Sequence, residues 1–343
     1  MVEIVEEAEP GALREAPLPS RSVLVRGLLV VVLVGALTPS VLGLLGRFGW
    51  LLDLCNHFRF QCVLVLLITT LGLVLMRCWR WSAVSLAGLV LNLAFVLPLY
   101  LGSPGIADPS RPTFTAMHFN VNTSNKNHEG VVGEVLQHQP DLLFVQEVNR
   151  RWLDELEGGL LGYELIAEDA RSDNFGIACF VRSGIDTGRT IQIEAARAFD
   201  LTGGVAQVPV IEVVFEWGGQ TVSVLSIHPL PPVSLAYARA RDASLKAAGE
   251  WSEAQETPRF IIGDFNATPW STAFRDLQSA GGLINSQAGF GRAPTWPAGL
   301  GSLGMIPIDH LLHSRDFVTV RRLIGQAHGS DHKPLVVELG WRD

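Results

Sequence analysis

Three apolar blocks without internal charges lie close together near the start of the chain, at residues 27–46, 60–76 and 82–101. Each is close to the ~20 residues that a helix needs to cross ~30 Å of hydrocarbon. The alternative is a signal peptide followed by buried core helices, but a signal peptide gives one short apolar region rather than three in series. The sequence therefore predicts a membrane domain over residues 22–102 with three transmembrane helices.

Basic residues near the ends of these blocks predict an orientation, because cytoplasmic connections are enriched in Lys and Arg. The side that holds the N-terminus has the larger set, which consists of Arg14, Arg21, Arg26, Arg77 and Arg80. The opposite side has Arg47, Arg59 and Arg111. We therefore expect the N-terminus in the cytoplasm and, after three crossings, a large C-terminal domain outside it.

The regions beside the apolar blocks differ in composition. Residues 1–21 are acidic and contain several prolines, which is typical of a disordered tail, here on the cytoplasmic side. Residues 103–111 combine proline with small and polar residues and are predicted to be a linker. Residues 112–343 are long enough to form a globular domain with a sizeable core. Because Cys179 is the single cysteine in that part, no internal disulfide can support it.

The charge balance of the C-terminal part limits its partners. Residues 103–343 carry 19 Lys and Arg against 28 Asp and Glu. Proteins that bind long duplex DNA without sequence preference use basic surfaces that release counterions from the phosphates. The acidic balance therefore disfavours binding of long DNA, while a local phosphate pocket remains compatible with it.

Short apolar runs alternate with helical patterns in the C-terminal part, which favours an α/β sandwich. The helical patterns cover residues 130–138 and 235–254, and the second is rich in Ala, Leu, Arg and Glu. The predicted strands cover residues 114–121, 141–148, 176–182, 208–215, 221–228, 260–263, 309–313 and 335–339.

Polar side chains able to bind a metal or a phosphate stand at the ends of several predicted strands. Asn120 ends the first strand, Glu147 follows a fully apolar run, and His228 precedes a proline-rich loop. Each has a plain structural alternative when it is taken alone. An Asn can satisfy a turn, a Glu can be solvated or paired, and a His can belong to the core.

Two motifs near the C-terminus strengthen the functional interpretation. They are Gly263-Asp264-Phe265-Asn266 and Ser330-Asp331-His332, and Asp309 precedes a second histidine upstream. A carboxylate with an amide, and a carboxylate with an imidazole, can together hold a divalent ion and a phosphate. Because all these signals occur in one chain, we expect the side chains to converge on one site.

The order of these residues resembles the endonuclease/exonuclease/phosphatase superfamily, whose members include deoxyribonuclease I-like enzymes. The likeness covers residues 112–343 and depends most on the Gly-Asp-x-Asn and Ser-Asp-His motifs, with Thr295-Trp296 ahead of Asp309. The whole layout is similar to a bacterial membrane-anchored branch with three N-terminal spans. In that branch, motifs such as His228-x-x-Pro231-Pro232 recur.

The resemblance implies a four-layered α/β sandwich (deoxyribonuclease I-like) and a Mg²⁺-dependent phosphoester hydrolase, with Mn²⁺ as an alternative ion. It implies metal ligation by Glu147, Asn120 and Asp331. It also implies an integral protein of the bacterial inner membrane whose catalytic domain lies outside the cytoplasm.

The same resemblance implies the catalytic roles. Asp264 corresponds to the residue that orients and deprotonates the attacking water, and Asn266 to a phosphate donor. His332 corresponds to the histidine that binds the scissile phosphate, oriented by Asp309. His228 corresponds to the position that helps to protonate the leaving oxygen in deoxyribonuclease-like members. Independently, oxygen ligands suit Mg²⁺, and residues 103–343 contain no Cys/His cluster of the zinc type.

The sequence leaves the substrate open, because function depends on the loops around a shared site. One hypothesis is a nuclease or general phosphodiesterase outside the cytoplasm. Another is a hydrolase of phospholipid or lipid-linked phosphoesters at the membrane surface, and a third is a catalytically silent membrane-bound interaction module. Loops at residues 194–206 and 281–304 are expected to shape specificity. The lipid bilayer is the expected partner of the apolar blocks, and no protein partner can be inferred.

Overall fold

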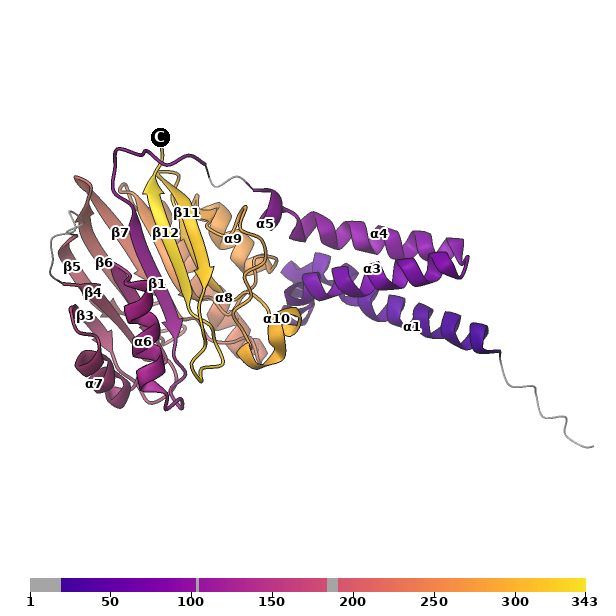
Figure 1. Ribbon diagram of the computed structural model, residues 1–343, viewed down its shortest axis with the longest axis horizontal. Coiled ribbons are helices and arrows are strands. Elements are labelled where there is room, and N and C mark those ends of the chain that lie inside the picture. The colour runs from indigo at the N-terminus through magenta and orange to yellow at the C-terminus, as the bar shows by residue number, and fades with distance from the viewer. Residues whose placement is uncertain (1–19, 103–104, 184–190) are drawn as a thin grey trace, which may run out of the picture.

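The computed structural model describes residues 20–102, 105–183 and 191–343. An α/β sandwich forms one end of the molecule, and a bundle of helices projects from its side (Figure 1). Most of the predicted tail at residues 1–21 and part of the predicted linker at residues 103–111 lie outside the described residues. The described end of that linker pairs with the last strand, because Ala107 forms an isolated β-bridge with Arg342.

The N-terminal bundle (residues 21–101) contains three long helices, α1 (Arg21–Leu42), α3 (Arg59–Leu75) and α4 (Trp79–Val96). The connection between α1 and α3 consists of η1 (Gly43–Phe48), α2 (Trp50–Leu54) and η2 (Cys55–Phe58). Three continuous helical segments are long and apolar enough to cross a membrane, Arg21–Phe48, Trp50–Leu75 and Trp79–Val96. The third ends before the predicted limit of residue 101, because Pro98 lacks a backbone N–H and starts the separate helix α5 (Pro98–Leu101).

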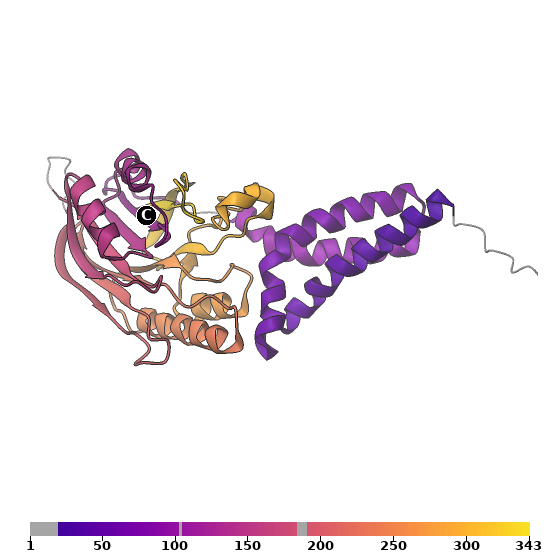
Figure 2. The same cartoon turned by 90° about the horizontal axis from the view of Figure 1, so that it is seen from below.

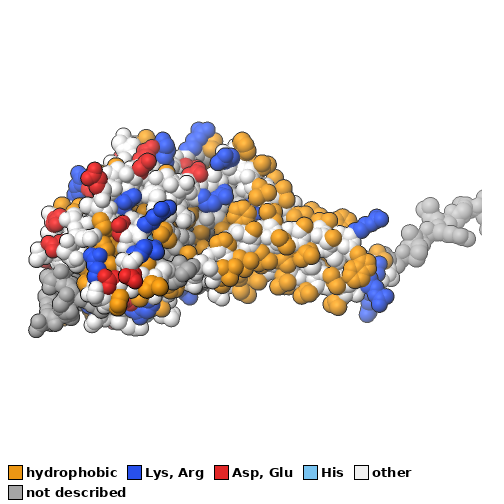
Figure 3. Space-filling model, turned by 90° about the horizontal axis from the view of Figure 1, so that it is seen from above, with side chains coloured by type: hydrophobic (Ala, Val, Ile, Leu, Met, Phe, Trp, Pro, Cys, Tyr) orange, Lys and Arg blue, Asp and Glu red, His pale blue; other side chains and the backbone are white. Residues whose placement is uncertain are grey.

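Apolar side chains cover the outer surface of the bundle as well as its interior. Leu33, Leu66 and Leu73 are fully buried between the helices, whereas Leu28 and Ile68 are exposed on the outside. Figure 3 shows the exposed apolar side chains along the bundle and basic side chains gathered at its far end. A helix bundle that is apolar all round is typical of a membrane domain.

Two six-stranded sheets form the sandwich. The first has the order β11-β12-β1-β2-β4-β3 and consists of β1 (Phe114–Asn120), β2 (Leu142–Gln146), β3 (Tyr163–Asp169), β4 (Ile177–Arg182), β11 (Phe317–Ile324) and β12 (Leu335–Trp341). The second has the order β5-β6-β7-β8-β10-β9 and consists of β5 (Gln192–Phe199), β6 (Val210–Trp217), β7 (Gln220–Ser226), β8 (Arg259–Asp264), β9 (Ile284–Asn285) and β10 (Asp309–His313). The pairs β1–β2 and β7–β8 are parallel, and the other paired strands are antiparallel.

Three apolar clusters hold four layers together. The largest lies between the two sheets and includes Phe114, Phe215 and Phe260. The second joins the first sheet to α6 (His128–His138) and α7 (Arg150–Gly159), and the third joins the second sheet to α8 (Leu235–Glu253) and α9 (Thr272–Ala280). The order helix, sheet, sheet, helix confirms the predicted four-layered sandwich.

The predicted loop at residues 194–206 is wrong over its first part, because residues up to 199 belong to β5. This strand lies at the edge of its sheet and has many exposed side chains, so it shows no apolar run. Its pairing with β6 decides its conformation. The predicted loop at residues 281–304 is mostly irregular, with β9, η3 (Ala298–Leu300) and α10 (Gly301–Gly304) inside it.

One end of the N-terminal bundle meets the sandwich (Figure 2). Buried polar contacts join the two parts. The Asp53 carboxylate pairs with the Arg241 guanidinium of α8 at 3.2 Å and accepts a hydrogen bond from the Thr272 backbone N–H at 2.7 Å. The His57 ring accepts a hydrogen bond from the Thr268 N–H at 3.3 Å. Because Thr268 lies in the loop between β8 and α9, the bundle supports the loop that leaves that strand.

We predict that Asp53→Ala destabilises this junction by about 3 kcal/mol, because a buried guanidinium loses one carboxylate and a backbone N–H loses its acceptor. Thermal unfolding of the full chain in detergent measures the effect. Asp242→Ala is the matched control, since its half-exposed carboxylate contacts the same guanidinium at 2.8 Å. Equal stability of the two variants would contradict the prediction.

Candidate functional site

The predicted site residues lie where the two sheets meet at one end of the sandwich. Because β1 and β2 are parallel, Asn120 and Glu147 emerge at the same edge of the first sheet. Because β7 and β8 are parallel, His228 and Asp264 emerge together from the second sheet. Asp309, at the start of β10, is the register partner of Asp264. The connection between β11 and β12 brings Asp331 and His332 to the same edge.

Unusual backbone conformations aim the side chains at this edge. Glu147 and Asn266 have positive φ angles of 61° and 48°. Gly263 has a φ of 148°, and a Cβ atom there would lie 2.0 Å from the Ile227 carbonyl oxygen. Only glycine therefore allows this close approach of β7 and β8. The Gln146 side chain joins the two sheets, since it donates to the Ile227 carbonyl at 2.8 Å and accepts from the Asp264 N–H at 3.1 Å.

Asp309 is the centre of a buried charge network. One carboxylate oxygen lies 2.7 Å from His118 Nε2, and the other lies 3.0 Å from His332 Nδ1. Burial opposes ionisation of Asp309, but the charge of His332 and the hydrogen bonds of both histidines hold its pKa well below the usual range. Burial likewise opposes the charge on His332, yet Asp309 and Asp264 raise its pKa to about 10. His332 is therefore an imidazolium at neutral pH.

Asp264 lies beside this imidazolium. Its Oδ1 accepts a hydrogen bond from the Asn266 N–H at 2.8 Å, and its Oδ2 lies 3.5 Å from His332 Nε2 and 3.7 Å from His228 Nε2. Burial raises the pKa of Asp264, and the charge on Asp309 adds to the rise although His332 opposes it. A carboxylate whose pKa lies nearer to neutrality is a stronger base than an ordinary Asp.

His228, unlike His332, is held in its neutral form. Burial, together with the charge on His332, lowers the pKa of His228 to about 3, so the ring is neutral. Its Nδ1 atom has no hydrogen-bond partner among residues 20–102, 105–183 and 191–343. A neutral ring can hydrogen-bond to a substrate oxygen through Nε2, the nitrogen that faces Asp264, but it is not a ready source of a proton.

Glu147, Asn120 and Asp331 occupy the outer side of the site. The Asn120 amide donates to Glu147 Oε1 at 2.9 Å and to Asp264 Oδ2 at 3.4 Å. Asp331 accepts hydrogen bonds from the Asn122 amide at 2.8 Å and from the Trp296 indole at 3.0 Å. Burial raises the pKa of Glu147, and the negative charge of Asp331 adds to that rise. The structure thus brings all the sequence-predicted site residues to one rim.

The donor set suits a divalent cation. Ligand atoms of Asp264, Asp309 and His332 lie within 4.8 Å of one another, so this buried group could hold an ion. However, the oxygens of Asp309 already contact two histidine rings, and His332 carries a proton. The carboxylate of Glu147 and the oxygen-rich rim around it are better suited to a hard ion such as Mg²⁺, which prefers oxygen ligands.

Comparison with known families supports the same conclusion as the geometry. The sequence model described as the Endonuclease/Exonuclease/phosphatase family matches residues 117–332, which is more than half of the chain. The chain belongs to this family. The match includes every predicted site residue and leaves the N-terminal bundle outside it. The predicted superfamily resemblance is therefore confirmed, and divalent metals are the ions that enzymes of this family use. No curated protein matches the chain by sequence.

Solved structures share the fold of the family domain. The structure of TDP2 from D. rerio complexed with a single-strand DNA product is 13% identical, with a TM-score of 0.55, and covers 66% of this chain and 99% of that chain. A family protein from Bacteroides vulgatus is 16% identical, with a TM-score of 0.54, and covers 68% and 100%. A mannosyl-6-phosphatase from Bacteroides thetaiotaomicron is 20% identical, with a TM-score of 0.50, and covers 66% and 100%.

Four further side chains contact the site residues, although the sequence predicted no site role for them. They are His118, Gln146, Asn122 and Trp296, which contact Asp309, Asp264 and Asp331. His118 and Gln146 are polar residues inside otherwise apolar strands, and burial of such residues requires a partner. That signal was available, but the partners come from the opposite sheet and could not be identified from the sequence.

Proposed function

We propose that this family member is a membrane-anchored, Mg²⁺-dependent phosphoester hydrolase, with Mn²⁺ as an alternative ion. One observation carries the proposal: a buried Asp264 with a raised pKa lies 3.5 Å from a histidine that is charged at neutral pH. A base for water and a cation for phosphate therefore stand side by side. The family fold supports hydrolysis of a phosphoester, and the pair explains how this chain performs it.

The residues of the site have different roles in hydrolysis. Asp264 accepts the proton of the attacking water. The Asn120 amide donates a hydrogen bond that holds Asp264 Oδ2 in place. His332 Nε2 donates to a phosphoryl oxygen, while Asp309 fixes the ring through Nδ1. Asn266 donates one amide hydrogen to the Pro229 carbonyl at 2.9 Å, which leaves the second for the phosphate.

A divalent ion bound by Glu147, Asn120 and Asp331 would neutralise charge on the phosphoryl oxygens and polarise the phosphorus centre. The neutral His228, whose Nε2 lies 3.7 Å from Asp264 Oδ2, would hydrogen-bond to the leaving oxygen. We therefore assign Asp264, His332, His228, Asp309 and Asn266 to catalysis, and Glu147, Asn120 and Asp331 to the metal.

We also propose the arrangement in the membrane. The helical segments of the bundle cross the bilayer, and basic side chains gather at the end far from the sandwich (Figure 3). Arg21 and Arg26 lie in the first part of α1, Arg77 lies between α3 and α4, and Arg80 lies in the first turn of α4. An excess of basic residues marks the cytoplasmic side, so the catalytic domain lies outside the cytoplasm, at the inner membrane of a bacterium. The proposed division is a tail at residues 1–21, a membrane domain at 22–102, a linker at 103–111 and a catalytic domain at 112–343.

Metal removal tests the proposal. We expect the purified full chain to hydrolyse p-nitrophenyl phosphate or bis(p-nitrophenyl) phosphate with Mg²⁺ and to lose this activity in excess chelator. In Glu147→Gln, the Mg²⁺ concentration for half-maximal activity rises at least about 100-fold, since loss of supporting residues alone costs 10–100-fold. The measurement is the initial rate over a series of Mg²⁺ concentrations.

Glu155→Gln is the matched control for this test, because Glu155 is an exposed residue of α7 away from the site. Its Mg²⁺ dependence should equal that of the wild type. Undiminished hydrolysis in excess chelator would contradict metal dependence. An inactive wild-type protein that binds Mg²⁺ would instead favour the silent interaction module.

A further inference from the structure

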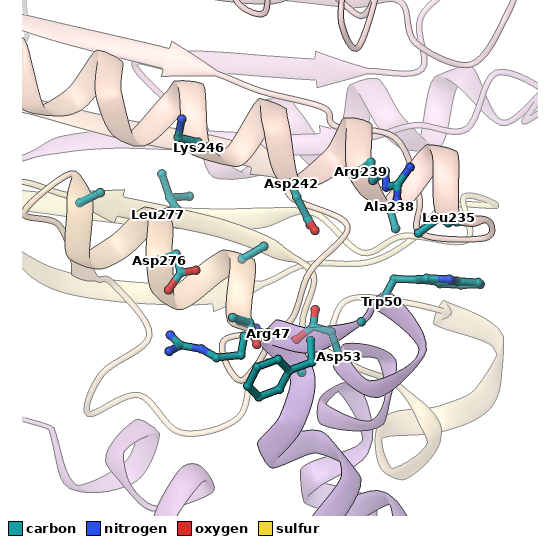
Figure 4. A pocket seen from close by; sticks show the side chains of 16 residues that line it. Arg47, Trp50, Asp53, Leu235, Ala238, Arg239, Asp242, Lys246, Asp276 and Leu277 are labelled. Carbon is teal, nitrogen blue, oxygen red and sulfur yellow. Dashed lines mark hydrogen bonds between the residues drawn. The ribbon is translucent and has the colours of Figure 1, made fainter.

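Two cavities lie at the junction between the N-terminal bundle and the sandwich. The larger has a volume of about 620 Å³ and is lined by charged side chains of both signs from α8, α9 and the α1–α3 connection (Figure 4). None of the proposed site residues lines it. The smaller has a volume of about 240 Å³ and is bounded mainly by apolar side chains. The smaller one, called here the junction cavity, is the one that adjoins the site.

Both parts of the molecule build the junction cavity. Leu54 and Phe58 come from the α1–α3 connection, whereas Pro232 and Val233 follow β7 and Ile306 precedes β10. The family match begins at residue 117, so the first two of these residues lie outside it. The cavity is therefore a feature of the way in which this chain joins its bundle to the family domain.

Two residues of the cavity wall connect it to the proposed catalytic centre. Asn266 lines the cavity and donates its backbone N–H to Asp264 Oδ1 at 2.8 Å. Trp296 also lines it, and its indole donates to Asp331 Oδ2 at 3.0 Å. Asn266 and Trp296 therefore belong both to the wall of the junction cavity and to the surroundings of Asp264 and Asp331.

Exposed apolar side chains surround the entrance. Val233 is 73% exposed and Phe58 is 50% exposed. Nearby, the Leu303 side chain is 61% exposed, while its carbonyl accepts a hydrogen bond from Gln61 at the start of α3. An apolar patch of this kind on a surface marks a place where apolar material binds. Here it lies next to the helices that are proposed to enter the bilayer.

We propose that the substrate of this enzyme is an amphipathic phosphoester whose apolar chain occupies the junction cavity while its phosphate reaches Asp264 and His332. This inference rests on the proposed hydrolase function and specifies its substrate class. The lining supplies apolar contacts to an alkyl chain and, apart from His57 and Asn266, little else. A nucleic-acid backbone would find no Lys or Arg in this wall.

The length of the substrate's alkyl chain provides the test. The full chain in nanodiscs is assayed on methyl and octyl p-nitrophenyl phosphate as diesters and on methyl and octyl phosphate as monoesters. Each buried methylene strengthens binding about fourfold. We expect kcat/KM of the octyl ester to exceed that of the methyl ester at least about tenfold in the ester class that the protein hydrolyses.

A pair of valine variants locates the effect. Val233→Asp should lower kcat/KM of the octyl ester about tenfold and leave the methyl ester unchanged, because Val233 touches no reacting group. Val205→Asp is the matched control, since Val205 is 66% exposed and does not line the junction cavity. Calorimetric titration of the metal-free protein with octylphosphonate should show the same tenfold loss of affinity in Val233→Asp alone.

The outcomes separate the inference from the function on which it rests. Equal kcat/KM for methyl and octyl esters, or an equal response of both valine variants, overturns the inference. Neither result contradicts the proposed hydrolase function. Hydrolysis of none of the four esters overturns the proposed function together with the inference. Phosphatidylglycerol and farnesyl phosphate in mixed micelles distinguish a glycerophospholipid from a prenyl phosphate. Cleavage of a single-stranded oligonucleotide but of neither lipid overturns the inference.

Discussion

Asp264→Asn is expected to lower kcat for phosphoester hydrolysis by about 10³-fold, within the 10²- to 10⁴-fold range that a positioned general base supplies. The amide keeps the size of the side chain and can still accept the hydrogen bond from the Asn266 N–H. It cannot accept a proton from water at neutral pH. The measurement is kcat at saturating substrate and Mg²⁺.

Folding of the same variant separates chemistry from structure. Burial raises the pKa of Asp264. Above the ordinary pKa of an Asp, ionisation of Asp264 therefore destabilises the metal-free fold, and this destabilisation grows as the pH rises toward neutrality. Asp264→Asn removes this cost, and its thermal midpoint without metal should equal or exceed that of the wild type. Asp276→Asn on the exposed face of α9 is the matched control and should keep full activity. Full activity of the Asp264→Asn protein would show that Asp264 is not the base.

The sequence predicted those parts of the fold whose signals are local. Strands β1, β2, β8 and β10 are buried along almost their whole length, and β2 and β8 appear as apolar runs. By contrast, β3 and β5 lie at sheet edges with partly exposed side chains, so pairing rather than composition defines them. Helices α7 and α9 were also missed, although both are amphipathic and Asn149 and Ser271 cap their N-termini, so local signals for these two helices were present in the sequence.

The candidate site residues could be selected from the sequence because polar residues recur at the ends of predicted strands and their order resembles that of a known family. Their mutual arrangement could not be predicted. The pairing of His118 with Asp309 joins residues 191 positions apart, and that of Asp53 with Arg241 joins residues 188 positions apart. No local pattern encodes contacts over such separations. The junction between bundle and sandwich, and with it the cavity beside the site, therefore emerged only from the structure.

Asp309→Asn is expected to reduce kcat/KM by about 10²- to 10³-fold and to destabilise the fold by about 3 kcal/mol, because it breaks a buried ion pair. In the wild type, Asp309 holds the pKa of His332 near 10, so His332 stays charged throughout pH 6–9. An amide at position 309 accepts a hydrogen bond but brings no negative charge. The pKa of His332 therefore falls, and the imidazolium becomes neutral within the ordinary assay range.

The sign of the pH dependence identifies the role of Asp309. Because a charged His332 binds the phosphate, the remaining activity of Asp309→Asn should fall as the pH rises above neutrality, whereas the wild type should show no such decline below pH 9. The stability contributed by the wild-type Asp309 carboxylate has its own pH window. Its folded pKa is depressed, so this stability is present above the ordinary Asp pKa and lost on acidification below it.

A buried ion pair elsewhere in the fold provides the control for a purely structural effect. Asp141 is buried and pairs with Arg182 at 2.6 Å at the end of the first sheet opposite to the site. Asp141→Asn should destabilise the protein to a similar degree, yet the pH profile of its hydrolysis should match that of the wild type. If Asp309→Asn also kept the wild-type profile, Asp309 would act on the fold alone, and the charge on His332 would not be the feature that binds the phosphate.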